Sequence, residues 1–407
     1  MNTVSDAPGK HMKRQAAFFF GSGISIPSGM PSVYQITNAA RDEEWHLTPD
    51  GVFRPGPNPN TAIPDCVTPI VKAFLAKVSD CAADYLAELA RPEAGRKPHY
   101  EDLFGLAEQA LRPETDHVPN LATVEFVRRL RRETAPLHCG FKGGSVGGDG
   151  FVGLATAACE LLHWVVHHKL HNGGKDRRGL KLTSETASAV AELDIFTLNH
   201  DLLVEAQLNA DGITDIETGF DDRTHGQFSV YRSAWWEDPK QPRKKVRLLK
   251  LHGSLNWWLY EFPGWARQYA VPDGDPFHSR DQHDQLVTLV DYKAAFLSGT
   301  IVKELRYGVG LWAELFLAFR AHLAKHTHLI CCGYGFGDTG INQRLVQWMS
   351  DTSNRLVILT PDPPDLYFSD KPYWLSQLWK QRRVIIVPNY LEQCTLDDLT
   401  PYFDPLA

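Results

Sequence analysis

Residues 18–32 of the chain read FFFGSGISIPSGMPS, an aromatic run that ends in a glycine-rich loop. The apolar run from Ala16 to Phe20 predicts a buried strand that stops at glycine. Gly21 and Gly23 permit a tight turn, and they let backbone N–H groups approach a phosphate with no Cβ in the way. A helix is expected to begin near Ser32. Such glycine turns also occur in proteins that bind nothing, so a purely structural interpretation stands beside the phosphate-binding one.

Further short apolar runs, each ending in polar or Gly/Pro turns, occur at residues 194–199, 246–253, 327–335, 355–362 and 382–389. Runs of this kind are typical of parallel strands that are covered on both faces. Helical stretches separate them, as at 308–324 and 341–349. Strands that alternate with helices predict a doubly wound α/β sheet. Ligands then bind at the carboxyl ends of the strands.

Two stretches depart from this alternation. Residues 50–65 are rich in Pro, Gly and Asn, which predicts a loop. Residues 67–171 have a mostly helical texture with a glycine-rich break at 139–153. We therefore expect a flexible arm at residues 1–14 and one domain over 15–407. Within that domain we interpret about 50–180 as a large, mostly helical insertion and about 260–300 as a smaller one.

The composition bounds the function. The chain has 407 residues and a net charge of −7, whereas a general nucleic-acid binder usually carries a basic excess. Its polar N-terminus does not resemble a signal peptide, and we predict a cytoplasmic protein that does not enter a membrane. The seven cysteines form no CxxC pair, so neither a zinc module nor a disulfide framework is expected. They are Cys66, Cys81, Cys139, Cys159, Cys331, Cys332 and Cys394.

Polar motifs follow three of the later strands. FTLNHDLLVE at 196–205 places Asn199 and Asp201 after a strand, where a helix-capping role is the simplest explanation. LLKLHGSLNWW at 248–258 places His252 and Gly253 after another, and a lone histidine there is more often structural than catalytic. GYGFGD at 333–338 is a further glycine segment.

Taken together, these motifs resemble those of the sirtuin family in family order. GSGISIPSGMPS is similar to the family's GAGIS-x-x-SGIP signature, and Asn199 and Asp201 match the second Asn and the Asp of its Asn-Thr-Gln-Asn-Ile-Asp motif. His252 matches the catalytic histidine, and 333–338 resembles the segment that contacts the cofactor's phosphate and ribose. Ser32-Val33-Tyr34 departs from the family's Asp-Phe-Arg, which covers the nicotinamide ribose.

The resemblance implies a Rossmann-like, NAD-binding α/β fold. It also implies a catalytic set and a cofactor-binding set. The catalytic residues are Asn199, His252 and Asp201. The cofactor-binding residues are Gly21, Ser22, Gly23, Ser25, Met30, Pro31, Asn199, Asp201, Gly333, Tyr334 and Asp338. No metal ligand is expected.

The chemistry that these residues suit is cleavage of the nicotinamide–ribose bond. The leaving nicotinamide departs neutral, so the carboxyl pair of ordinary glycosidases is not needed. Asn199 would orient the attacking water or the ribose, Asp201 would fix the local geometry, and His252 would accept a proton. Because the four-cysteine zinc module of deacylating sirtuins is missing, we favour an NAD⁺ hydrolase. An NAD-dependent deacylase or ADP-ribosyltransferase, and a non-catalytic NAD or ADP-ribose sensor, remain the alternatives.

The motif pattern also resembles the sirtuin-like effectors of prokaryotic anti-phage systems, which deplete NAD on infection. The resemblance implies a homo-oligomer that is controlled by a partner, for which a HerA-type ATPase fits best. The pairs Trp235-Trp236 and Trp257-Trp258 either pack in the core or form contact surfaces. The spacing of His163, His167 and His171 suits a polar helix face better than zinc, and the basic run at 242–247 suits a solvated turn better than nucleic acid. Ser22 and Ser25 lack the G-x-S-x-G elbow of a nucleophile.

Overall fold

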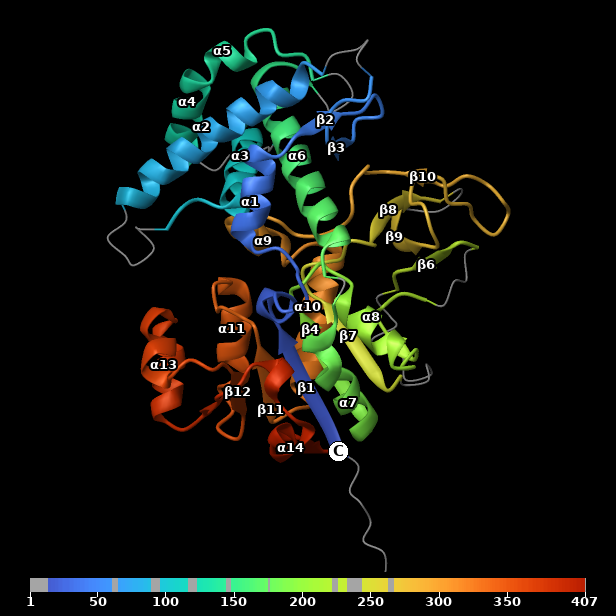
Figure 1. Ribbon diagram of the computed structural model, residues 1–407, viewed down its shortest axis with the longest axis vertical. Helices are drawn as coiled ribbons and strands as arrows, with labels where there is room; N and C mark the ends of the chain where they lie inside the picture. The colour runs from blue at the N-terminus through green and yellow to red at the C-terminus, as the bar shows by residue number, and fades with distance from the viewer. Residues whose placement is uncertain are drawn as a thin grey trace, which may run out of the picture.

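An eight-stranded sheet organises the chain in the computed structural model (Figure 1), in the order β13-β12-β11-β1-β4-β7-β5 with β14 beside β1. All neighbours pair in parallel except β14, which is antiparallel to β1. The strands are β1 (Arg14–Phe20), β4 (Glu192–Thr197), β5 (Ile216–Glu217), β7 (Val246–Lys250), β11 (His328–Cys332), β12 (Arg355–Leu359), β13 (Val384–Val387) and β14 (Asp404–Pro405). The structure describes residues 14–60, 65–88, 96–115, 123–143, 148–174, 176–221, 226–232, 244–262 and 267–406. The predicted parallel sheet is confirmed.

Both faces of the sheet are covered, which explains why β1 is apolar at almost every position. Ala17 and Phe19 pack on one face with α10 (Gly310–Leu323), α11 (Thr339–Trp348) and α13 (Tyr373–Lys380). Phe18 and Phe20 pack on the other face with α7 (Lys181–Ala189), α8 (Leu203–Ala210) and α14 (Leu396–Leu399). A strand with one solvated face would alternate instead.

The position of β1 marks the topological switch point of the sheet. The chain adds β4, β5 and β7 on one side of β1, then crosses over and adds β11, β12 and β13 on the other. Ligands of doubly wound sheets bind in the crevice outside the carboxyl ends of the strands at such a point. The loops after β1 and β11 are therefore the first place to look for a site.

Above the carboxyl ends of the strands lies a helical module, which we define as residues 33–172 (Figure 1). It contains α1 (Val33–Asp42), α2 (Val67–Glu88), α3 (Tyr100–Thr115), α4 (Val124–Glu133), α5 (Ala135–His138) and α6 (Gly150–Asn172). By length and composition α6 would suit a membrane span, but most of its apolar stretch is buried inside the protein. The helical texture predicted for 67–171 is thus present, while its interpretation as an insertion stays a prediction.

Two segments differ from the sequence-based expectation. Residues 50–65 are not wholly a loop, because β3 (Phe53–Pro55) pairs with β2 (Trp45–Leu47) and buries Phe53. Arg14 belongs to β1 rather than to a flexible arm, because it pairs with Pro405, and residues 1–13 lie outside the described part of the chain.

Much of the region around residues 260–300 belongs to a second, antiparallel sheet in the order β10-β8-β9-β6. Its strands are β6 (Phe228–Val230), β8 (Trp258–Glu261), β9 (Arg267–Pro272) and β10 (Thr288–Leu289). Trp257 and Trp258 are buried in two different core clusters, so this pair offers no contact surface. Trp235-Trp236 lies outside the described residues.

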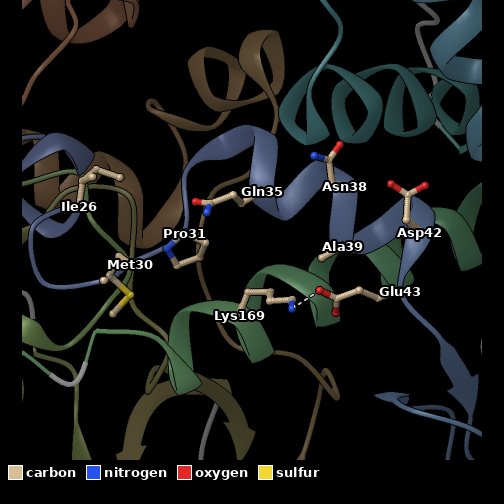
Figure 2. A pocket seen from close by; sticks show the side chains of 10 residues that line it. Ile26, Met30, Pro31, Gln35, Asn38, Ala39, Asp42, Glu43 and Lys169 are labelled. Carbon is tan, nitrogen blue, oxygen red and sulfur yellow. Dashed lines mark hydrogen bonds and ion pairs between the residues drawn. The ribbon is translucent and has the colours of Figure 1, made fainter.

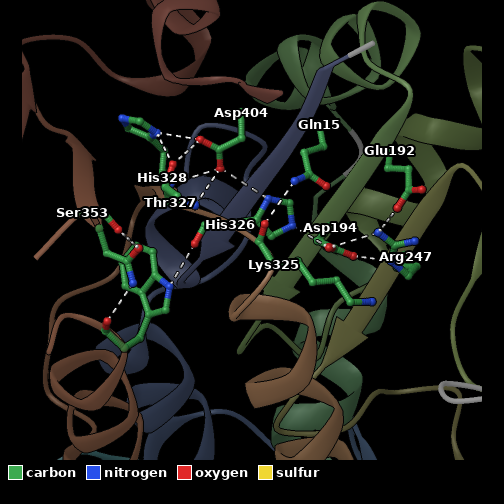
Figure 3. A network of polar contacts seen from close by, with 12 residues as sticks. Gln15, Glu192, Asp194, Arg247, Lys325, His326, Thr327, His328, Ser353 and Asp404 are labelled. Carbon is green, nitrogen blue, oxygen red and sulfur yellow. Dashed lines mark hydrogen bonds and ion pairs between the residues drawn. The ribbon is translucent and has the colours of Figure 1, made fainter. Parts of the chain in front are cut away.

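A buried polar network ties the amino-terminal ends of the strands together (Figure 3). Asp194 of β4 accepts hydrogen bonds from Arg247 of β7 (3.1 Å from Nη2) and from His326, which precedes β11 (2.7 Å). Asp404 of β14 accepts from the backbone N–H of Thr327 (2.8 Å). Burial alone would raise the pKa of Asp194, but the hydrogen bonds from His326 and Arg247 hold it well below its ordinary value. Arg247, the last residue of the basic run, is therefore an interior ion-pair partner and not a nucleic-acid contact.

Candidate active site

The loops that follow β1, β4, β7 and β11 carry almost all of the predicted site residues. The glycine loop after β1 turns into the short 3₁₀ helix η1 (Ser22–Ser25), and Asn199 and Asp201 follow β4. His252 follows β7, and the segment 333–338 follows β11. Because the strands are parallel, all four loops lie at the same edge of the sheet, beneath the helical module.

The two glycine segments pack backbone against backbone. The N–H groups of Gly21 and Gly23 donate to the carbonyl oxygens of Cys332 and Gly333, both at 3.0 Å. A Cβ on Gly21 would lie 2.5 Å from the oxygen of Gly333, and one on Gly23 would lie 2.7 Å from the Cα of Gly333. The close contact between the two loops is by itself enough to require glycine at both positions. The phosphate contact stays a prediction.

Ser25, Asn199 and Asp201 form one buried, hydrogen-bonded cluster. The Ser25 hydroxyl donates to Oδ2 of Asp201 (2.9 Å) and accepts from Nδ2 of Asn199 (3.0 Å). The other oxygen of Asp201 accepts from the N–H of Leu203 at the start of α8 (3.1 Å). Three residues predicted separately from the sequence thus act as one unit, although 174 positions separate Ser25 from Asn199.

This cluster fixes the orientation of the Asn199 side chain. The Asp201 carboxylate can only accept hydrogen bonds, so the Ser25 hydroxyl donates to it. The Ser25 oxygen must then accept a hydrogen bond from the amide nitrogen of Asn199. The carbonyl oxygen of Asn199 is then the side-chain atom that takes no part in the cluster. It is buried, with the residue 7% exposed, and has no hydrogen-bond partner among the described residues. Buried polar atoms are nearly always paired, so an unpaired acceptor here indicates a place for a water or a ligand hydroxyl.

Lys250, which the sequence did not single out, supports the loop that carries this cluster. It is the last residue of β7 and is almost fully buried. Its ammonium group donates to the backbone carbonyl of Asp201 and to Oε1 of Glu205 (2.8 Å). A lysine between the apolar residues Leu249 and Leu251 was the available signal, because buried lysines need partners.

His252 contacts two side chains that come much later in the sequence. Its Nε2 lies 2.7 Å from the hydroxyl oxygen of Tyr307 and 3.4 Å from Oδ2 of Asp338. Tyr307 lies at the carboxyl end of α9 (Thr300–Arg306), and its hydroxyl in turn donates to Asp338. Burial lowers the pKa of His252, and the hydrogen bond to Asp338 opposes that effect only in part. The imidazole is thus biased toward its neutral form, as a base near neutral pH requires.

His200 is a second histidine in the same place. Its ring centroid lies 6.3 Å from that of His252 and 4.8 Å from that of Phe296, to which it is tilted. Burial and the neighbouring His252 lower the pKa of His200 well below its ordinary value. His200 stands between Asn199 and Asp201 in the sequence, where the family motif has Ile. The structure makes it an uncharged neighbour of the catalytic candidate.

The remaining predicted cofactor residues fall into two groups. Met30 and Pro31 line an open pocket of about 550 Å³ between the glycine loop, α1 and α6, with Gln35, Asn38 and Lys169 also on its wall (Figure 2). Asn199 and His252 do not line this pocket. The role of Met30 and Pro31 in binding a cofactor stays a prediction.

Tyr334 and Asp338 are engaged inside the protein. The hydroxyl of Tyr334 donates to Oδ1 of Asn342 (3.0 Å), and its ring packs against Phe19. Oδ1 of Asp338 accepts from the N–H of Ile341 (2.9 Å) at the start of α11, and its other oxygen accepts from Tyr307. Any contact of Tyr334 with a ligand would come from its backbone, and its cofactor role stays a prediction, as does that of Asp338.

At the departure from the family signature, Ser32 caps α1. Its side chain accepts from the N–H of Gln35 (3.3 Å), and the Gln35 side chain accepts from the N–H of Ser32 (2.7 Å), which is a capping box. Tyr34 lies half-exposed with its ring edge toward His99. A helix start thus occupies the place where the family carries its ribose-covering residues.

The described residues contain no group of three or more His, Cys, Asp or Glu side chains placed to hold a metal ion. His163 is buried and stacks on Phe296 at 4.2 Å between ring centroids. It therefore packs in the core and does not lie on the solvated helix face that its spacing suggested. Cys331 and Cys332 are buried in β11, as their apolar run predicted.

A known family model matches the part of the chain that carries three of these motifs. Residues 194–386, a little under half of the chain, match a family model described as a SIR2-like domain. The matched range includes the Asn199, His252 and 333–338 motifs but not the glycine loop. SIR2-like domains use NAD⁺, so the match supports a sirtuin-like family and NAD-related chemistry.

Among solved structures, one described as "The Structural basis of Sirtuin Substrate Affinity" is 12% identical over 89% of this chain and 88% of that chain, with a TM-score of 0.30. A likeness with so low a TM-score carries no conclusion, and the fold described above rests on this chain's own sheet. No curated protein matches the chain significantly.

Proposed function

We propose that this protein is an NAD⁺ hydrolase that releases nicotinamide and ADP-ribose. The observation that carries the proposal is the Ser25–Asn199–Asp201 cluster, which leaves one buried amide oxygen without a partner at the carboxyl edge of the sheet. His252, whose lowered pKa favours the neutral imidazole, follows β7, the strand beside β4. The SIR2-like match supports NAD as the substrate.

The reaction balances with these groups alone. The bond between the anomeric ribose carbon and the nicotinamide nitrogen breaks, and its electron pair neutralises the pyridinium. Water then adds to the oxocarbenium-like carbon, with the Asn199 oxygen accepting one of its hydrogens to orient it. The proton that the water loses passes to His252, which later releases it to solvent. A positioned base of this kind contributes roughly 10²–10⁴-fold to rate.

Two other functions use the same site. A deacylase or ADP-ribosyltransferase would deliver the ribose to an acceptor other than water, and a sensor would bind NAD or ADP-ribose without turnover. We favour water because the cysteine pairs of the zinc module in deacylating sirtuins are missing from the sequence. The Asn199 oxygen is also suited to orient a water.

The biological setting that we propose is NAD depletion in prokaryotic anti-phage defence, in the cytoplasm. Uncontrolled NAD loss would harm the host cell. We therefore propose a homo-oligomer whose activity is held in check by a partner protein, with a HerA-type ATPase as the first candidate. These proposals come from the resemblance of the motifs, and co-purification of the untagged chain with such an ATPase tests them.

The test of the reaction uses purified protein and NAD⁺ without an acyl peptide, with nicotinamide and ADP-ribose measured by chromatography. Asn199→Ala and His252→Ala are expected to lower the rate by at least 100-fold, the lower end of what loss of such a group costs. Asn209→Ala and His283→Ala remove the same side-chain types from exposed positions and serve as matched controls.

Three outcomes would contradict the proposal. Nicotinamide that appears only when an acyl-lysine peptide is added would indicate a deacylase. Tight NAD binding without turnover, with the ATPase partner present as well as absent, would indicate a sensor. Wild-type rates in both alanine variants would place the chemistry elsewhere.

A further inference from the structure

Tyr307, which was not among the predicted site residues, contacts the catalytic candidate His252. Its hydroxyl oxygen lies 2.7 Å from Nε2 of His252 and also contacts Oδ2 of Asp338. The rings of Tyr307 and His252 stack with centroids 5.8 Å apart and an angle of 19°. The three groups form a triangle, because Nε2 of His252 also lies 3.4 Å from Oδ2 of Asp338. Asp338 stands at the start of α11, Tyr307 at the end of α9 and His252 in the loop after β7.

The direction of the two hydrogen bonds follows from the protonation of their ends. Burial alone would raise the pKa of Asp338, but the hydrogen bonds and charge of its partners, His252 first, hold it well below its ordinary value. Burial and the Asp338 charge raise the pKa of Tyr307, which therefore keeps its proton. A carboxylate can only accept, so the Tyr307 proton points to Asp338 and the Tyr307 oxygen must accept from His252. Nε2 of His252 then carries a hydrogen.

The Tyr307 ring is held from several sides. Gly340 makes room for it, because a Cβ there would lie 2.5 Å from the Tyr307 ring. Phe316 packs against it at 4.2 Å between centroids, and the guanidinium of Arg344 lies 5.6 Å from its centroid. Asp338 is fixed in turn because its Oδ1 caps α11. This arrangement is built to keep one geometry and not to open.

We propose that Tyr307 is a positioning residue that holds His252 in the Nε2–H tautomer, so that Nδ1 is the nitrogen that accepts the proton. The inference rests on the proposed function only in the use that it gives to Nδ1. The tautomer itself is a property of the unliganded protein. The relation is that of a carboxylate that orients a catalytic histidine, with a tyrosine hydroxyl that contacts both groups.

The charged and titratable surroundings of His252 come from four elements. His200 follows β4, Lys303 and Tyr307 belong to the α9 segment, Glu101 begins α3, and Asp338 precedes α11. Lys303 and Glu101 neutralise each other in an ion pair of 2.8 Å. Asp338 is therefore the negative charge that selects which histidine nitrogen carries the hydrogen.

The test is nitrogen NMR of the protein with ¹⁵N-labelled histidine and no substrate, in which the two tautomers have different Nδ1 and Nε2 shifts. His252→Gln identifies the resonances. The wild type is expected to show the Nε2–H form, and Tyr307→Phe a mixture. Asp338→Asn is the sharper variant, because its amide would donate to Tyr307, whose hydroxyl would then donate to Nε2 and invert the tautomer. Tyr260→Phe is the control: it removes another buried hydroxyl, which donates to the Pro276 carbonyl, and should leave both histidine nitrogen shifts as in the wild type.

In kinetics, Tyr307→Phe is expected to lower kcat by about 10- to 100-fold, the range for a lost hydrogen bond to a charged group, with KM little changed. The acid limb of its pH–rate profile should move to lower pH, since the imidazolium loses an acceptor. An unchanged tautomer in both Tyr307→Phe and Asp338→Asn would overturn the proposal whether or not hydrolysis is observed. A chain that shows the predicted tautomers but hydrolyses no NAD, with the ATPase partner present as well as absent, would refute the proposed function and leave the tautomer proposal standing.

Discussion

Replacing Gly21 by alanine tests the contact on which the site is built. The backbone of Gly21 is extended, with φ −105° and ψ 178°, so alanine can adopt it without strain and the cost comes from the contact alone. The added Cβ would lie 2.5 Å from the oxygen of Gly333 and 2.6 Å from the Cα of Tyr334, where 3.4–4 Å is ordinary. Both neighbours are backbone atoms, so the two loops must separate by about 1 Å. Overpacking of this kind costs roughly 1–3 kcal/mol.

The magnitude decides the assay. With an unfolding entropy of roughly 2.1 cal/mol/K per residue, a chain of 407 residues changes its Tm by only about 1–4 °C for that cost. Denaturant unfolding therefore measures it better than a thermal scan. Gly335→Ala is the matched control, because a Cβ there meets no atom within 4 Å, and its stability should stay within about 1 kcal/mol of the wild type. Equal midpoints for Gly21→Ala and Gly335→Ala would show that the two loops do not pack as described.

Two further predictions concern charge. Asp194→Asn leaves Arg247 with only the less buried carboxylate of Glu192, and should cost at most about 3–5 kcal/mol, the range for a fully uncompensated buried charge, at neutral pH against an exposed control, Asp397→Asn. Because the folded pKa of Asp194 is depressed, its contribution is present above the unfolded pKa near 3.9 and is lost as pH falls through the folded value; a deficit in the variant that stays constant down to pH 2 would argue against this. Because burial lowers the pKa of His252, the acid limb of kcat/KM for NAD hydrolysis should lie below the ordinary histidine value of about 6.5. A limb at or above pH 6.5 would exclude a buried, neutral His252 as the base.

The sequence predicted those parts of the fold that a short apolar run specifies by itself. Both faces are buried in the strands β1, β4, β7, β11, β12 and β13. Each of them can therefore be predicted from its own apolar run, without knowledge of its neighbours. The antiparallel sheet was not predicted, since a strand as short as Thr288–Leu289 has no period to detect. Phe53–Pro55 was misjudged for a related reason: Gly51 and Gly56, both with positive φ, turn a Pro- and Gly-rich stretch back against Trp45–Leu47. Local composition indicated a loop, and tertiary pairing made a strand.

The candidate site divides along the same line. Ser25, Asn199, Asp201 and His252 each lie in a loop that follows a strand, where a parallel sheet collects its functional residues. Position alone left capping or structural roles open, and the resemblance of the motifs in family order singled these residues out. Tyr307 lies 55 residues beyond His252 and directly follows a short helix, and nothing in its own neighbourhood marks it. Its role exists only through the packing that brings α9 onto the loop after β7. Hydrogen-bond partners such as Tyr307 decide which atom of a catalytic side chain carries a proton. The sequence motifs thus identify the side chains of the site, and the contacts made on folding decide which of their atoms can react.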